Sequence, residues 1–193
     1  MRIIAGRWRG RVIAAPQGSD TRPTSDRVRE AMFSSIVSRV GDIAGHRVLD
    51  MYAGSGALGL EALSRGAAHV TFVEPDRRAC SAIRKNLGSL GATSGEASVA
   101  QTTAERYTAD ATGGGTVSLL FADPPYRIDA ARVTQVLEVL VASGQLEPGA
   151  LVVYEHGARV TVTWPEGFAA VASRTYGDTA VSYAEYEGLS ATP

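Results

Sequence analysis

The stretch best suited to chemistry is a short apolar run that ends in Asp123-Pro124-Pro125-Tyr126. Residues 119–122 predict a buried strand, which delivers the next four residues as a polar and rigid tip. Proline fixes φ at about −65° and has no N–H group, so the carbonyl oxygens of the tip are held out as acceptors. Asp123 and the carbonyl of Pro124 could accept hydrogen bonds from both hydrogens of an exocyclic amine. Tyr126 could stack on the ring that carries this amine. The simpler interpretation is a proline turn in which Tyr126 covers the core.

A second candidate site lies between residues 47 and 59, where a strand, a turn of small residues and a helix start follow one another. Residues 54–59 match G-x-G-x-x-G, in which the glycines let the backbone approach a nucleotide closely. Glu74 follows Gly54 by 20 residues, which is the spacing of an acid that binds a ribose. This motif alone also fits NAD.

Asp50 favours a different nucleotide. It places a carboxylate at the strand end, where the pyrophosphate of NAD requires neutral backbone, and NAD chemistry has no use for the tip at 123–126. A carboxylate there suits a cation, such as the α-amine of a methionine moiety. S-adenosylmethionine fits both observations, with Asp50 at its methionine end, Glu74 on its ribose and its methyl group directed towards residues 123–126.

The elements that position these residues alternate between strands and helices. We expect strands near 47–52, 69–74, 97–102, 117–122 and 150–155, and helices near 57–65, 76–90, 104–109 and 130–143. This order predicts an α/β fold with a parallel sheet and helices on both faces. Two closing runs, 169–176 and 180–187, predict an antiparallel hairpin at a sheet edge.

The first 40 residues are basic. They carry eight arginines against three acidic residues, a charge of +5, whereas the whole chain has a net charge of −1. Residues 2–14 contain two β-prone runs around an Arg7-Trp8-Arg9 tip, which predicts a hairpin. Cations beside an aromatic ring suit single-stranded nucleic acid. The alternative, which we weigh equally, is that Trp8 packs on the domain.

A helix is predicted from a cap at Thr24 or Ser25 to about Val40. Arg27 and Arg29 leave this helix from faces other than its apolar stripe, so they extend the basic surface of the hairpin or form an ordinary solvated face.

Composition narrows the class of protein. The 193 residues suffice for one domain and a small appendage, and no apolar run approaches the roughly 18 residues of a membrane span. We therefore expect a cytoplasmic protein. The single Cys80 excludes an internal disulfide and a cysteine-built zinc site, and the three histidines lack ligand spacing, so no metal is expected.

The combined motifs are similar to those of class I methyltransferases that modify exocyclic amines of nucleobases. More closely, the chain resembles the RsmD family of 16S ribosomal RNA guanine-N2 methyltransferases. The resemblance runs to about residue 187 and rests on residues 2–6, 22–30, 50–56, 59–67, 73–76, 123–126 and 176–179.

The resemblance implies a Rossmann-like, S-adenosylmethionine-dependent methyltransferase domain at 24–193 and a basic β-hairpin extension at 1–23. The implied cofactor-binding residues are Asp50, Tyr52, Ala53, Gly54, Gly56, Glu74, Pro75, Asp123 and, at the adenine, Thr103 and Ala104. Asp123, Pro124, Pro125 and Tyr126 would hold the target base. The expected RNA-binding residues are Arg7, Trp8, Arg9, Arg11, Arg22, Arg27 and Arg29. The implied partner is 16S rRNA in an assembled or partly assembled small ribosomal subunit, bound by a monomer.

Three other functions fit parts of the pattern. A DNA adenine-N6 or cytosine-N4 methyltransferase would use the same tip, but 193 residues leave no room for a large recognition domain. A small-molecule amine methyltransferase would not need a basic N-terminal end. A non-catalytic RNA-binding module would not need intact motifs at both candidate sites.

Overall fold

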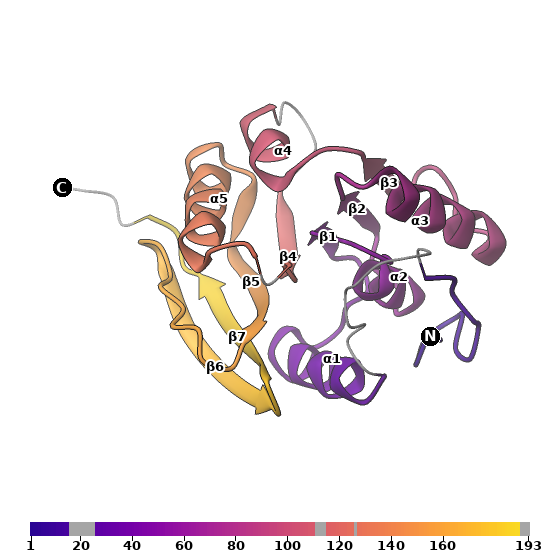
Figure 1. Ribbon diagram of the computed structural model, residues 1–193, viewed down its shortest axis with the longest axis horizontal. Helices are drawn as coiled ribbons and strands as arrows, with labels where there is room; N and C mark the ends of the chain where they lie inside the picture. Colours follow the sequence, from indigo (N-terminus) through magenta and orange to yellow (C-terminus); the bar gives the residue numbers. More distant parts are fainter. Residues whose placement is uncertain (16–25, 111–114, 126, 190–193) are drawn as a thin grey trace.

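The computed structural model describes residues 1–15, 26–110, 115–125 and 127–189, and in Figure 1 they form one sheet with helices on both sides. The sheet has seven strands in the order β3-β2-β1-β4-β5-β7-β6. The strands are β1 (Arg47–Met51), β2 (His69–Val73), β3 (Ala97–Ala100), β4 (Val117–Ala122), β5 (Leu146–Gly157), β6 (Phe168–Tyr176) and β7 (Thr179–Tyr186). The helices are α1 (Asp26–Val40), α2 (Ala57–Ser64), α3 (Arg77–Leu90), α4 (Ala104–Asp110) and α5 (Ala130–Ala142).

The predicted fold class is confirmed. Strands β1 to β5 pair in parallel, and β7 joins β5 antiparallel before β6 closes the edge. The main difference lies in β5, which begins at Leu146 and was expected near residue 150. Its early start pairs with Val117, and a shift of register follows before Leu119.

Both faces of the sheet are covered, which explains why β4 is a continuous apolar run. Leu119 and Phe121 point into a core shared with α1, α2 and α3. Leu120 and Ala122 point into a second core shared with α4 and α5. Among the residues described, no helix is both long and apolar enough to cross a membrane.

The N-terminal segment is a reduced form of the expected hairpin. One isolated antiparallel bridge joins Arg2 to Val12, and residues 7–10 turn between them. Trp8 is only 7% exposed and packs in the first core. The structure therefore contradicts the prediction of Trp8 as an open stacking surface for a base and favours the alternative of packing on the domain. The expected helix caps at Thr24 and Ser25 lie outside the described residues.

We predict that Gly59→Ala lowers the free energy of unfolding. A Cβ atom at this position of α2 would lie 2.3 Å from Cε1 of Phe72 and 2.8 Å from Cγ1 of Val70. Such overpacking costs about 1–3 kcal/mol. Urea unfolding provides the measurement.

The matched control is Gly88→Ala in α3, where a Cβ atom would meet nothing within 4 Å. Because alanine is the better helix former, this variant should gain about 0.5–1 kcal/mol. Equal effects of the two substitutions would contradict the close approach of α2 to the sheet.

Candidate active site

The carboxyl ends of four neighbouring parallel strands bring the predicted site residues together. Glu74 follows β2, Asp50 lies near the end of β1, and Asp123 follows β4. The strand register pairs Met51 with both Val73 and Ala122, so the residues after these positions meet at one edge. The two sequence motifs therefore form one site.

Glu155 is the acidic residue of this edge that sequence reasoning missed. The pairing of Ala122 with Tyr154 places Glu155 beside Asp123. The sequence could have indicated Glu155, because it ends the predicted strand 150–155 and other predicted strands also have an acidic residue at or near their ends.

The turn between β1 and α2 has an unusual backbone. Tyr52, Gly54 and Gly56 have φ values of 59°, 53° and 75°. A Cβ atom at Gly56 would lie 3.0 Å from Cγ1 of Ile83, so the turn needs glycine there for space as well as for conformation. A Cβ at Gly54 would meet only the carbonyl of Tyr52, at 3.8 Å, which leaves room for a ligand beside that backbone.

Glu74 holds this turn from the next strand. One carboxylate oxygen accepts a hydrogen bond from the amide of Gly54 at 2.9 Å, and the other accepts from the amide of Asp76 at 2.8 Å. A carboxylate has about four acceptor positions, so two remain for the hydroxyl groups of a ribose. The thiol of Cys80, the only cysteine, donates to the backbone carbonyl of Glu74 at 3.1 Å.

Asp50 contacts the start of α2, which follows this turn. It is 1% exposed, and its Oδ2 accepts from the amide of Gly59 at 2.9 Å. Burial raises the pKa of Asp50 to about 8, opposed by the hydrogen bond from Gly59 and assisted by the charge of Glu74. Since Gly56, the residue before α2, provides no side-chain cap, Asp50 satisfies one amide of the first turn of the helix. A cation near this carboxyl group would offset the cost of ionising it.

Asp123 is half-buried at the start of the proline tip. Burial raises its pKa well above the ordinary value, with further contributions from the charges of Glu155 and Asp50. Pro124 and Pro125 are half-buried, and the carbonyl of Pro125 accepts from the amide of Ile128 at 2.8 Å. Tyr126, the predicted base-stacking residue, lies outside the described residues.

The other predicted cofactor residues lie near the same edge. Pro75 is exposed after Glu74, and the amide of Ala53 bonds to the carbonyl of Val73. Thr103 is exposed and Ala104 is buried where the chain enters α4 after β3. The side chain of Thr103 accepts from the amide of Arg106 at 3.3 Å.

The expected basic surface is only partly present. Arg9 and Arg27 are exposed, whereas the exposed Arg7 pairs with Glu96 and Arg11 donates to the carbonyl of Ser89. Arg22 lies outside the described residues.

The structure contradicts Arg29 as a surface contact for RNA. Its side chain is 1% exposed and donates to the carbonyl of Arg2 and to Asp26, and it faces Glu61 at 4.0 Å. The helical spacing of 29, 32, 33 and 36 places Arg29 on the buried face of α1, because Met32, Phe33 and Ile36 are all buried there. The apolar stripe predicted for this helix contained Met32 and Ile36, which are buried, but the prediction left out Arg29 and Phe33 of the same face.

Comparisons with known proteins agree with this geometry. The family model described as "Conserved hypothetical protein 95" matches residues 1–185. The chain is 34% identical over 187 residues to ribosomal RNA small subunit methyltransferase D of Haemophilus influenzae, covering 97% of this chain and 93% of that protein. The chain belongs to the RsmD family.

Two further relatives support this membership of the RsmD family. The protein of the same name from Escherichia coli strain K12 is 40% identical over 155 residues, which are 80% of this chain and 74% of that protein. A solved structure of the putative methyltransferase yhhF from Escherichia coli has a TM-score of 0.83 at 34% identity, covering 98% of this chain and 99% of that one. The fold of the RsmD-family chain is therefore the class I methyltransferase fold.

We predict that Asp50 makes the stability of this RsmD-family protein decrease with pH. Its pKa is about 8 when folded and 3.8 ordinarily. Between these values the unfolded chain releases a proton that the folded protein keeps, so the free energy of unfolding falls as pH rises. The slope is at most about 1.4 kcal/mol per pH unit for one proton.

The measurement is urea unfolding of the wild type and of Asp50→Asn between about pH 4 and about pH 8. The contribution of Asp50 to the free energy of unfolding is complete below its ordinary pKa. This contribution is lost as the pH rises towards the pKa of Asp50 in the folded protein. The stability of the wild type relative to the variant should therefore fall across this range. A relative stability that stays level or rises with pH would exclude a neutral Asp50.

Proposed function

We propose that the protein transfers a methyl group from S-adenosylmethionine to the exocyclic N2 of a guanine in 16S rRNA. The observation that carries this proposal is the meeting of the glycine turn, Asp50, Glu74 and Asp123 at one edge of the sheet. The names of the relatives supply ribosomal RNA of the small subunit as the substrate class.

The residues of the turn fit the methyl donor. Glu74 has acceptor capacity for ribose hydroxyl groups, and Gly54 leaves open space beside the backbone. Asp50 gives the methionine end a buried carboxyl group that favours a neighbouring cation, and Thr103 and Ala104 would line the adenine. S-adenosylmethionine supplies a methyl group bound to a positively charged sulfur.

Asp123 would act on the acceptor nitrogen. Its carboxylate and the carbonyl of Pro124 would accept the two amine hydrogens and direct the nitrogen lone pair towards the methyl group. The N–C bond forms as the C–S bond breaks, and the electron pair of that bond stays on sulfur. Asp123 or water takes the surplus proton, and the carboxylate stabilises the positive charge that develops on nitrogen.

The target base has to leave any base pair, because a paired guanine does not present N2 in this way. It would lie in a loop or swing out onto Tyr126, at a cost of a few kcal/mol when stacking is lost. Arg9 and Arg27 are exposed and would contact phosphates independently of sequence. We infer an assembled or partly assembled small subunit as the substrate, since the recognition surface is small.

We predict that Glu155 adds to the effect of burial on the pH dependence of methyl transfer. Asp123 must be ionised to act, so kcat/KM should rise as pH passes through its raised pKa. Glu155→Gln removes the larger of the two electrostatic contributions that raise this pKa. The acidic limb of the pH profile should therefore move to lower pH.

The exposed Glu138 of α5 provides the control, because Glu138→Gln should leave the limb in place. An unchanged acidic limb in Glu155→Gln would rule out the proposed influence on Asp123.

The proposed activity is tested with labelled S-adenosylmethionine and three acceptors: small ribosomal subunits lacking the modification, the same RNA without protein, and duplex DNA. Label should enter only RNA-containing acceptors, as N2-methylguanine. Asp123→Ala should reduce the rate by at least about 100-fold. Label on DNA, or on no nucleic acid, would refute the function, and the two RNA acceptors identify the assembly state used.

A further inference from the structure

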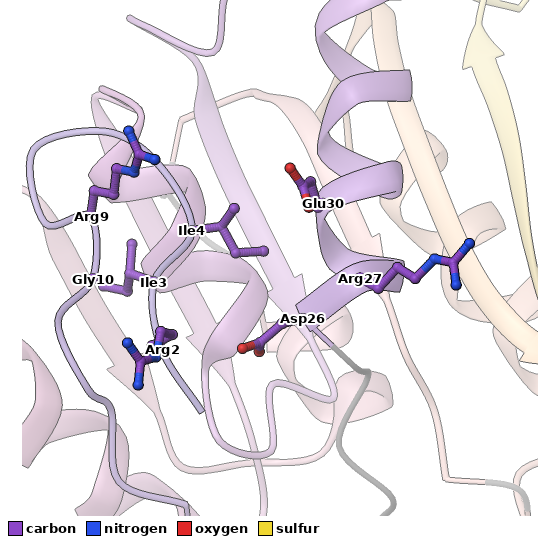
Figure 2. Close-up of a pocket in the computed structure, with 8 residues that line it drawn as sticks. All are labelled: Arg2, Ile3, Ile4, Arg9, Gly10, Asp26, Arg27 and Glu30. Carbon is purple, nitrogen blue, oxygen red and sulfur yellow. The ribbon is translucent and has the colours of Figure 1, made fainter.

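A hollow of about 420 Å³ separates the N-terminal loop from the start of α1 (Figure 2). Its volume lies within the range of about 300–1,000 Å³ found for small-ligand sites. The loop wall carries Arg2 and Arg9. The α1 wall carries Asp26 and Glu30, which point towards the loop in the figure, and Arg27, which points away from it. The two walls therefore differ in charge.

This arrangement suits a nucleotide. Guanidinium groups on one wall bind phosphate oxygens, and carboxylates on the other accept hydrogen bonds from the N–H groups of a base. The apolar residues Ile3 and Ile4 also line the hollow. Asp26 bonds to Arg29, whereas Glu30 is exposed on α1.

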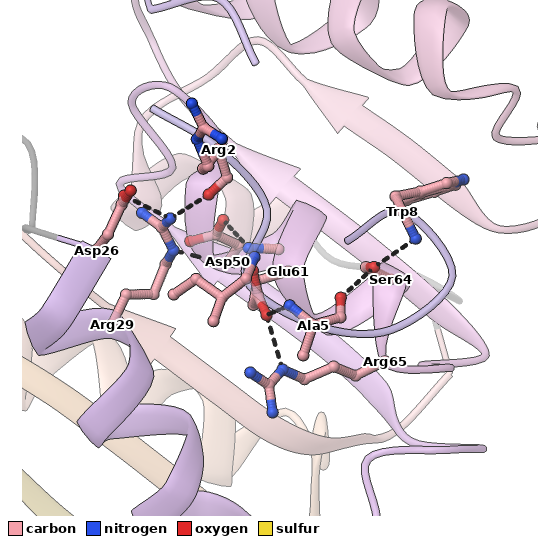
Figure 3. A network of polar contacts seen from close by, with 11 residues as sticks. Arg2, Ala5, Trp8, Asp26, Arg29, Asp50, Glu61, Ser64 and Arg65 are labelled. Atoms are coloured by element: carbon pink, nitrogen blue, oxygen red, sulfur yellow. Dashed lines mark hydrogen bonds and ion pairs between the residues drawn. The ribbon is translucent and has the colours of Figure 1, made fainter. Parts of the chain in front are cut away.

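One buried carboxylate joins the two walls from beneath (Figure 3). Glu61 of α2 is 0% exposed and accepts from the amides of Ile4 at 2.8 Å and Ala5 at 3.0 Å. It also accepts from Nε of Arg65 at 2.8 Å and lies 4.0 Å from Nε of Arg29 on α1. A single side chain thus holds both the loop and α1.

The loop is seated on the end of α2 by further contacts. Ser64 accepts from the amide of Trp8 at 3.0 Å and donates to the carbonyl of Ala5, and its own carbonyl accepts from the amide of Arg7. Gly6 has φ +80°, and a Cβ atom there would lie 1.8 Å from the carbonyl oxygen of Ser64. The loop can therefore take this position only with glycine at residue 6.

We propose that the hollow is a subsite for a nucleotide of the substrate RNA other than the target guanine, and that Glu61 is the positioning residue that sets its width. This inference rests on the proposed function. Glu61 and Ser64 lie in the same helix whose beginning forms the cofactor turn, but their contacts are to the loop and to α1. Their loss should therefore affect RNA more than cofactor.

The test separates the KM for RNA from the affinity for S-adenosylhomocysteine. Gly6→Ala forces the loop away from Ser64, and Glu61→Gln replaces an acceptor with a donor that faces other donors. Each should raise the KM for RNA about tenfold, with kcat and the Kd for S-adenosylhomocysteine nearly unchanged. Gly41→Ala is the matched control, because Gly41 has φ +79° and nothing within 4 Å of an added Cβ atom.

Two wall variants test the hollow itself. Arg9→Gln and Glu30→Gln should each raise the KM for RNA several-fold in the wild type and much less in Gly6→Ala, since contacts that depend on one geometry are not additive. Arg106→Gln on α4, on the other side of the sheet, should have no effect.

The outcomes are distinct. A normal KM for RNA in both Gly6→Ala and Glu61→Gln, or an effect of Arg9→Gln without one of Glu30→Gln, would overturn the subsite and leave the proposed function intact. Loss of S-adenosylhomocysteine binding together with RNA binding would show that Glu61 supports the fold of α2, and would also overturn the positioning role. Absence of methyl transfer to RNA by the wild type would instead refute the proposed function.

Discussion

Two carboxyl groups hold the turn between β1 and α2 and the first turn of α2 through backbone amides, and the geometry of the site depends on these contacts. Asp50 binds the amide of Gly59, and Glu74 binds that of Gly54. Both acids come from strand ends because parallel strands finish at one edge of the sheet. The same topology places Asp123 and Glu155 at this edge, so several acidic side chains lie close together and are partly removed from water. A cationic ligand would oppose the burial and charge repulsion that raise the pKa values of Asp50 and Asp123.

Much of the fold follows from sequence pattern. The alternation of strands and helices after residue 47 fixed the parallel sheet, and Asp50 and Asp123 could be placed at strand ends because each follows a short apolar run. Glycine at 54 and 56 indicated the turn, since few other residues adopt its φ values. These signals are local, and the parallel strands β1, β2 and β4 bring the residues that carry them to one edge of the sheet.

The errors arose where side chains from distant segments meet. Arg29 is charged, so its polarity suggested the surface, but Glu61 lies 32 positions along the chain and pairs with it in the interior. Trp8 appeared suited to stacking, but the core beneath the loop accepts its ring. Glu61 lies in an apolar helix and binds the amides of Ile4 and Ala5. The residues next to Glu61 in the sequence give no sign of these distant contacts.

The thiol of Cys80 can report on local opening of the structure through its reaction with a thiol reagent. It is the only cysteine, it is 0% exposed, and its sulfur bonds to the backbone of Glu74. Burial and the charge of Glu74 raise the pKa of this thiol, which keeps it in its less reactive form. A thiol reagent can therefore reach it only during excursions that part α3 from the end of β2. The rate of its modification would report how often the edge of the sheet that carries Glu74 opens, with no label added to the chain.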